Sequence, residues 1–125
     1  MLVSAIILAA LAFSRSGPNE LESLLISSRW NYERPYFYAE MEIQNISTRA
    51  AQSARIQVTY TDTLRRKIVG ISTEKHDLRT NPLGPREHRG FSVQTHAPDI
   101  LLYLAQNRVP FNSIKGDVEI WLYDR

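Results

Sequence analysis

The sequence predicts an all-β protein, an antiparallel β-sandwich of six to seven strands, preceded by a hydrophobic helix at the N-terminus. Three observations carry this prediction. The chain has 125 residues, enough for one domain with a single core. Short segments with alternating apolar and polar residues recur along it, and clusters of turn-forming residues separate them. An up-and-down barrel is the second architecture that fits this pattern.

The composition is that of a globular domain and excludes several classes of protein. Hydrophobic residues make up 43% of the chain and charged residues 22%. The chain has no cysteine, which excludes a disulfide scaffold, a thiolate metal site and a cysteine nucleophile. Fifteen Lys and Arg against thirteen Asp and Glu give a net charge of +2, without the clustered basic face typical of dedicated nucleic-acid binders. We therefore expect no nucleic-acid partner.

The first 14 residues form an apolar segment without a charged side chain, and a polar stretch follows at residues 15–19. About thirteen helical residues span only about 20 Å, less than the ~30 Å hydrocarbon layer, so the length fits a signal peptide better than a transmembrane span. Residues 10–12 (Ala-Leu-Ala) resemble a cleavage site, although the positively charged region expected before the apolar run is missing. Three fates stay open: a retained anchor or docking helix, a cleaved signal, or a buried N-terminal element.

This segment sets the expected domain organisation. Residues 1–14 are the signal or anchor segment, residues 15–20 a linker, and residues 21–125 the β-sandwich domain. An anchor or a signal would place the domain outside the cytoplasm, in the periplasm or on the cell surface, unless Arg15 keeps its flank inside. In the anchored case the domain is also associated with the membrane through residues 1–14.

Strands are predicted wherever apolar and polar residues alternate, because successive side chains of a strand point to opposite faces. In the first clear case Phe37, Ala39, Met41 and Ile43 define the dry face. Five segments show this alternation: residues 36–44, 54–61, 67–74, 90–96 and 114–123. Residues 62–66 form the predicted hairpin turn after the second segment.

Three further assignments depend on residue parity or spacing. Leu24, Ile26, Trp30 and Tyr32 share one parity and predict an additional strand with these residues on one face. In the segment at residues 67–74, Val69, Ile71 and Thr73 line one face and Ile68 lies on the other. Residues 98–108 are the only stretch with helical spacing and predict one or two helical turns.

The order of these elements resembles the FxLYD-type immunoglobulin-like domains of bacterial envelope proteins, over roughly residues 36–93. In that family an Asn-x-Ser/Thr turn closes the first long strand, as Asn45-Ile46-Ser47 would here. The motif that names the family falls on residues 58–62, where only Asp62 matches literally. Residues 83–87 resemble the L-x-P-G-E turn, with arginine where glycine is usual. The resemblance implies an immunoglobulin- or fibronectin-III-like sandwich in an envelope protein.

The sequence contains no pattern typical of an enzyme. Neither a G-x-S-x-G nucleophile elbow nor a glycine-rich phosphate loop occurs. The histidines are His76, His88 and His96, and the last two would lie about 26 Å apart along one extended strand, too far to share a metal. We therefore expect a non-catalytic protein without cofactor or metal.

Two pairs of carboxylates lie two residues apart on the predicted strands, namely Glu40 with Glu42 and Asp117 with Glu119. Such a pair could serve as acid and base or bind Ca²⁺. The interpretation that we favour is a solvated face opposed across the sheet by Arg55 or Lys115.

Two groups of side chains are candidate contact surfaces. Aromatic residues that face outward mark a partner-contact patch, unless the N-terminal segment or the loop at residues 98–108 covers them. They are Tyr36, Tyr38, Trp121 and Tyr123. A basic group around two turns would meet at one end of the sandwich and face anionic lipid or an acidic subunit, unless these are ordinary exposed turn residues. It consists of Arg65, Arg66, Lys67, Arg86 and Arg89, with His88 beside them.

Two functions are compatible with these features. The first is a non-catalytic, N-terminally tethered extracytoplasmic interaction or scaffolding module, an accessory subunit of a membrane or envelope protein complex. The second is a soluble periplasmic ligand-binding or chaperone-like β-sandwich released by signal cleavage, which holds a peptide or sugar at a sheet edge or on the aromatic face. Retention of Met1 would favour the first function, and a mature start near residue 13 the second.

Overall fold

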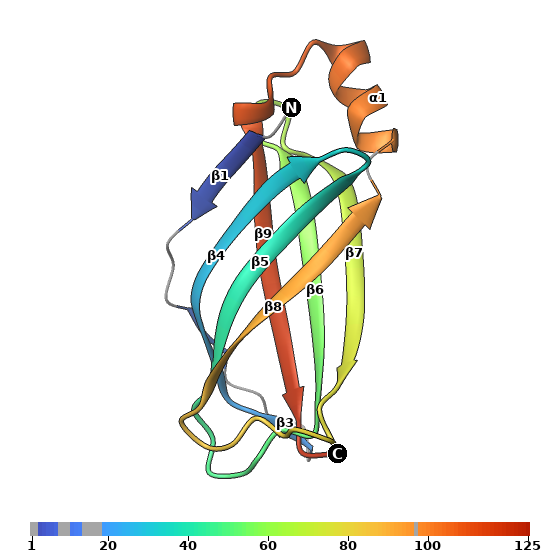
Figure 1. Ribbon diagram of the computed structural model, residues 1–125. Helices are drawn as coiled ribbons and strands as arrows, with labels where there is room; N and C mark the ends of the chain where they lie inside the picture. Colours follow the sequence, from blue (N-terminus) through green and yellow to red (C-terminus); the bar gives the residue numbers. More distant parts are fainter. Residues whose placement is uncertain (1–2, 8–10, 14–18, 97) are drawn as a thin grey trace.

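The computed structural model describes residues 3–7, 11–13, 19–96 and 98–125, and most of these residues lie in strands. The elements follow one another along the chain as shown in Figure 1. They are β1 (Val3–Ile7), β2 (Leu11–Phe13), β3 (Glu20–Leu21), β4 (Ser23–Glu33), β5 (Tyr36–Asn45), β6 (Ser53–Asp62), β7 (Lys67–Asp77), β8 (His88–His96), α1 (Pro98–Asn107), a 3₁₀ turn at Phe111–Ser113, and β9 (Ile114–Tyr123).

The strands form two antiparallel sheets. Sheet A has the order β1-β4-β5-β8, with β2 also paired to β4, and sheet B has the order β3-β9-β6-β7. Figure 1 shows one sheet in front of the other, with α1 at one end and the connections between β5 and β6 and between β7 and β8 at the opposite end. The prediction of a mostly β protein built from two antiparallel sheets is confirmed.

The predicted N-terminal helix is wrong where the structure describes this segment. Residues 3–7 form β1 and residues 11–13 form β2, and both pair antiparallel with β4, from Val3 opposite Tyr32 to Phe13 opposite Ser23. A short apolar run does not reveal by periodicity whether it is helix or strand. The edge of β4 offers backbone N–H and C=O groups, which an extended segment satisfies and a helix does not. The other residues of the predicted leader, and residues 15–18 of the linker, lie outside the described residues.

Three aromatic rings join the sheets at the centre of the core. Trp30 of β4 and Phe37 of β5 meet Tyr60 of β6, with ring centroids 5.2 to 5.9 Å apart, and all three side chains are buried. Gly116 of β9 lies beneath them. A Cβ atom at this position would lie 3.0 Å from Trp30 Cδ1 and 3.3 Å from Tyr60 Cε1, so any larger residue requires the rings to shift by a few tenths of an ångström.

A bulge in β4 corrects the predicted parity of that strand. The register with β5 shifts between Leu25 and Ser27. As a result Leu25 is buried, whereas Leu24 and Ile26 are only half-buried. Trp30, which lies beyond the shift, is buried as predicted. One extra residue reverses which side chains point inward, and composition alone does not reveal it.

A second register shift separates residues that were predicted to share one face of β7. The register with β6 shifts at Tyr60, which is opposite Gly70, so that one residue of β7 has no counterpart. Ile71 is therefore 54% exposed on the outer face. Gly70 faces inward toward Ile100 of α1, whose Cδ1 atom would lie 2.6 Å from an added Cβ. The predicted helical segment is confirmed as α1, which buries Ile100 and Leu104.

Gly116→Ala is expected to destabilise the fold by about 1–3 kcal/mol, because the added methyl group forces buried rings to move. Urea unfolding of both proteins measures the difference. Gly90→Ala is the matched control, since the nearest atom to a Cβ there is the Met41 carbonyl oxygen at 3.9 Å. Equal effects of the two substitutions would contradict the proposed packing at Gly116.

Candidate functional site

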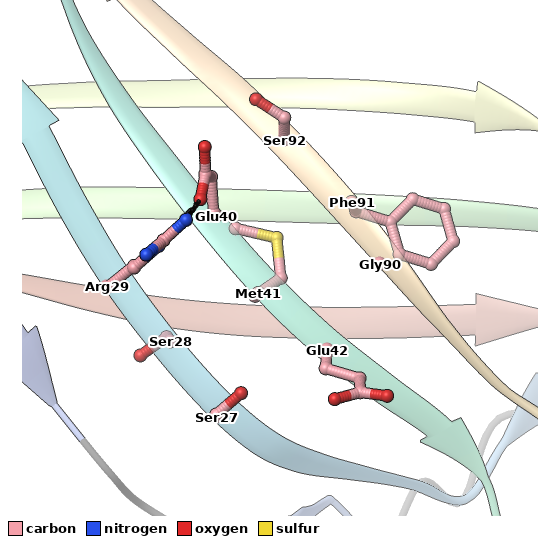
Figure 2. A pocket seen from close by; sticks show the side chains of 9 residues that line it. All are labelled: Ser27, Ser28, Arg29, Glu40, Met41, Glu42, Gly90, Phe91 and Ser92. Carbon is pink, nitrogen blue, oxygen red and sulfur yellow. Dashed lines mark hydrogen bonds and ion pairs between the residues drawn. The ribbon is translucent and has the colours of Figure 1, made fainter.

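A hollow of about 600 Å³ lies on the outer face of sheet A, across its three neighbouring strands β4, β5 and β8 (Figure 2). It exists because small residues, Ser27 of β4 and Gly90 and Ser92 of β8, flank the longer side chains of β5. The lining residues are Ser27, Ser28, Arg29, Glu40, Met41, Glu42, Gly90, Phe91 and Ser92.

The two carboxylates of the hollow have different partners. Arg29 Nε donates a hydrogen bond to Glu40 Oε2 at 2.6 Å, and Figure 2 shows the two side chains meeting between β4 and β5. Glu42 Oε1 lies 2.5 Å from His88 Nδ1 at the start of β8. An arginine is always charged, whereas a histidine is a full cation only when protonated. Glu40 is therefore paired with a permanent cation, whereas the partner of Glu42 is an imidazole.

These partners differ from the predicted ones. Arg55 and Lys115 lie in sheet B, and Lys115 Nζ is 3.5 Å from Asp117 rather than close to a carboxylate of sheet A. The predicted partner Lys115 thus lies near Asp117, along the same strand rather than across the sheet. For Glu40 and Glu42 the prediction is wrong, because β5 belongs to the other sheet. The partners of Glu40 and Glu42 come from β4 and β8, the strands that flank β5.

The predicted aromatic residues form two separate patches. Tyr36 and Tyr38 are half-buried on the outer face of sheet A, with ring centroids 5.9 Å apart, and Tyr38 is followed on that face by Glu40 of the hollow. Trp121 and Tyr123 of β9 lie on the outer face of sheet B, on the other side of the sandwich. The Arg55 guanidinium lies 4.1 Å over the Trp121 ring. The structure therefore divides the predicted aromatic patch between the outer faces of the two sheets.

The predicted basic residues also divide into two groups. Arg65, Arg66 and Lys67 lie in the β6–β7 hairpin at the α1 end, where Arg65 Nη2 donates to the Asn107 carbonyl at 3.1 Å. Arg86 and Arg89 lie at the opposite end, in the turn before β8 and at its start. The two groups are separated by the length of β7, eleven residues or roughly 35 Å. The prediction that they meet is wrong, while a contact role for either group stays a prediction.

Asp62 organises the α1 end. Its buried carboxylate accepts hydrogen bonds from the Tyr103 hydroxyl of α1 at 2.8 Å and from the backbone N–H groups of Leu64 and Arg65 at 3.0 and 3.4 Å. Burial alone would raise the pKa of this carboxyl, but these hydrogen bonds, with that of the Arg65 side chain, lower it below the ordinary value. The sequence indicated a hairpin turn here but not the contact with α1, which depends on tertiary structure.

Asn45 has the corresponding role at the opposite end, as the predicted Asn-x-Ser turn. Its side-chain amide donates to the carbonyl oxygens of Arg49 at 2.8 Å and Leu83 at 2.9 Å. Its Oδ1 atom accepts from the backbone N–H and the hydroxyl of Ser47 at 3.0 and 2.6 Å. Asn45 is fully buried, and these four bonds satisfy its side chain.

The three histidines are distributed along the edges of the two sheets. His88 and His96 lie at opposite ends of β8, as predicted. The ring centroids of His96 and Tyr36 are 5.7 Å apart. His76 of β7 packs against Phe91, with ring centroids 5.3 Å apart. Within the residues that the structure describes, no three His, Asp or Glu side chains gather closely enough to hold a metal ion.

Comparison with known proteins shows little similarity in sequence. No family model and no curated protein matches the chain. A solved structure with a similar arrangement is that of a DUF1425 family member from Shewanella sp. pv-4, which is 12% identical over 97% of this chain and 96% of that one, with a TM-score of 0.47. The resemblance to FxLYD-type domains stays a prediction. Among the described residues, no helix has the length and apolar character needed to cross a bilayer.

Asp62→Asn is expected to lower the stability near neutral pH and to weaken its dependence on pH in acid. The folded-state pKa of Asp62 lies below the unfolded-state value of about 3.9, so its charge stabilises the fold fully above that value. This stabilisation is lost as the pH falls through the folded-state pKa. Urea unfolding across the acid range measures both effects. Asp117→Asn removes the same charge from an exposed position, and an identical pH profile for the two variants would contradict the expectation.

Proposed function

We propose that this chain is a non-catalytic interaction or scaffolding module, tethered by its N-terminus outside the cytoplasm, that serves as an accessory subunit of a membrane or envelope protein complex. The observation that carries the proposal is the outer face of sheet A, where Tyr36 and Tyr38 adjoin the charged hollow. Half-buried tyrosines next to polar groups are typical of interface hot spots, because they provide apolar area together with a hydrogen-bonding group.

The connections between the strands support an immunoglobulin-like assignment within this proposal. The hairpins β4–β5 and β6–β7 lie in different sheets, and β8 and β9 then return to pair with β5 and β6. This Greek-key arrangement is shared by immunoglobulin-like sandwiches, which present broad faces and loops to partners. The fold by itself implies no activity, so the function rests on the surface features.

The proposed tether uses the apolar residues 1–14, part of which the structure places in β1 and β2. In an anchored chain these residues would leave β4 for the bilayer, and the exposed edge of β4 would become a second place for a partner strand. Transfer of the apolar side chains from water to hydrocarbon is favourable in free energy, and this offsets the loss of the backbone hydrogen bonds to β4.

Replacing Tyr38 by serine is expected to weaken capture of the partner complex by about tenfold or more, with little change in the melting temperature. Trp121→Ser is tested separately, because Trp121 lies on the outer face of sheet B. Pull-down from membranes of the natural host measures capture, and thermal unfolding measures stability. If Tyr38→Ser lowers the melting temperature as much as a core substitution, Tyr38 is structural and the proposed contact face is wrong.

The intact mass of the natural protein distinguishes the tethered module from the second function, a ligand-binding or chaperone-like domain released by cleavage. The hollow favours this alternative as well, since it could hold part of a peptide. We expect the membrane-bound protein to retain Met1. A soluble periplasmic protein that starts near residue 13 would overturn the tether and support release.

A further inference from the structure

Strand β8 has an open edge. Among the residues that the structure describes, no strand pairs with β8 on the side away from β5. Side chains of β7 form hydrogen bonds with some of the backbone groups at this edge. Glu74 Oε2 accepts from the Gln94 N–H at 3.0 Å, and Ser72 Oγ donates to the Gln94 carbonyl at 3.2 Å. The contact with β7 closes the half of the edge that lies near α1.

The other half of the edge is accessible. Alternate residues of a strand direct their backbone groups to the same side, so the N–H and C=O groups of Gly90 and Ser92 point away from β5, as those of Gln94 do. Gly90 and Ser92 are exposed, and no described residue outside β5 forms a hydrogen bond with their backbones. The stretch His88–Ser92 therefore presents a short row of backbone donors and acceptors.

This row borders the hollow. Gly90 and Ser92 line both the edge and the hollow, and Gly90, which has no side chain, is opposite Glu42 of β5. Among the residues that the structure describes, Glu42 is paired with His88 alone, whereas Glu40 is paired with Arg29. A cationic side chain that arrives over Gly90 would meet a carboxylate whose described partner is a histidine rather than an arginine or a lysine.

We propose that the stretch His88–Ser92 binds an extended polypeptide segment by β-strand addition, and that a lysine or arginine of this segment crosses Gly90 to pair with Glu42. In this mode main-chain hydrogen bonds supply affinity and a hollow for alternate side chains supplies specificity. The inference rests on the proposed function and defines the chemistry of the partner. A second copy of this chain fits less well, because Arg89 already donates to the carbonyls of Asn81 and Pro82 and would bring Glu42 no cation.

The test is a titration of the full chain, followed by amide NMR, with three synthetic peptides. The first is an acetylated octapeptide of alternating threonine and lysine, the second has glutamate in place of lysine, and the third is the lysine peptide with alternate backbone nitrogens methylated. We expect the lysine peptide to shift the amides of Gly90 and Ser92 and to bind about tenfold more tightly than the other two. Equal binding of all three peptides, or shifts confined to other strands, would overturn the proposal.

Variants of the chain separate the contribution of the Ser92 backbone N–H to peptide binding from that of the Glu42 charge. Ser92→Pro removes an outward N–H without removing a hydrogen bond to β5, and we expect it to weaken binding of the lysine peptide about tenfold. Ser92→Ala keeps the N–H and should bind within about twofold of the original chain. Glu42→Gln should abolish the preference for lysine over glutamate. If Ser92→Pro fails to fold, the methylated peptide still tests the backbone hydrogen bonds and Glu42→Gln still tests the ion pair.

Two further outcomes distinguish the inference from the function on which it rests. If Ser92→Pro captures the membrane complex as well as the original chain does, the edge proposal fails and the interaction module stands. If the lysine peptide binds at Gly90 but no complex is captured, the proposed function fails and the edge site stands. Concentration-dependent dimers that Ser92→Pro abolishes would assign the edge to a second copy and overturn the peptide proposal.

Discussion

The contact of Trp30, Phe37 and Tyr60 above Gly116 is the constraint on which the rest of the structure depends. It joins four strands from both sheets, and it defines which side of each strand faces inward. Because side chains alternate along a strand, the inward position of Phe37 places the residues on either side of it, Tyr36 and Tyr38, on the outer face of β5. The hollow and the tyrosines are thus consequences of how the core is packed.

The sequence was sufficient for those strands whose alternation is uninterrupted. Strands β5, β6 and β9 occur within a residue or two of their predicted bounds, and the predicted dry face of β5 is buried. It was insufficient at β4 and β7, where a register shift reverses the parity and exposes Ile71. The apolar start of the chain was assigned to a helix for a different reason, because only the presence of the β4 edge favours strands there.

The candidate site was less predictable than the fold, because it consists of neighbours that are distant along the chain. The periodicity placed Glu40 and Glu42 on an outer face but did not show that Arg29 and His88 flank them. Ser92 and Gly90 are conspicuous only once β8 lies beside β5. The same limit explains the basic turns, which looked alike in sequence although the fold places them at opposite ends. Strand pairing, which composition does not encode, decides these features.

The pairing of β3 with β9 determines which end of the sandwich lies closest to the N-terminal segment. Leu21 pairs with Leu122, and the backbone N–H of Asp124 donates to the Asn19 carbonyl at 3.0 Å, so the sandwich begins and ends at the same pole. If the chain is held through its first fourteen residues as proposed, the tether joins the sandwich at this pole, and α1 and the β6–β7 hairpin lie at the other pole (Figure 1). The ten residues of β9 separate the two poles by about 30 Å. Strand β8 would run along the flank between the poles, within reach of a partner that lies beside the molecule rather than above it.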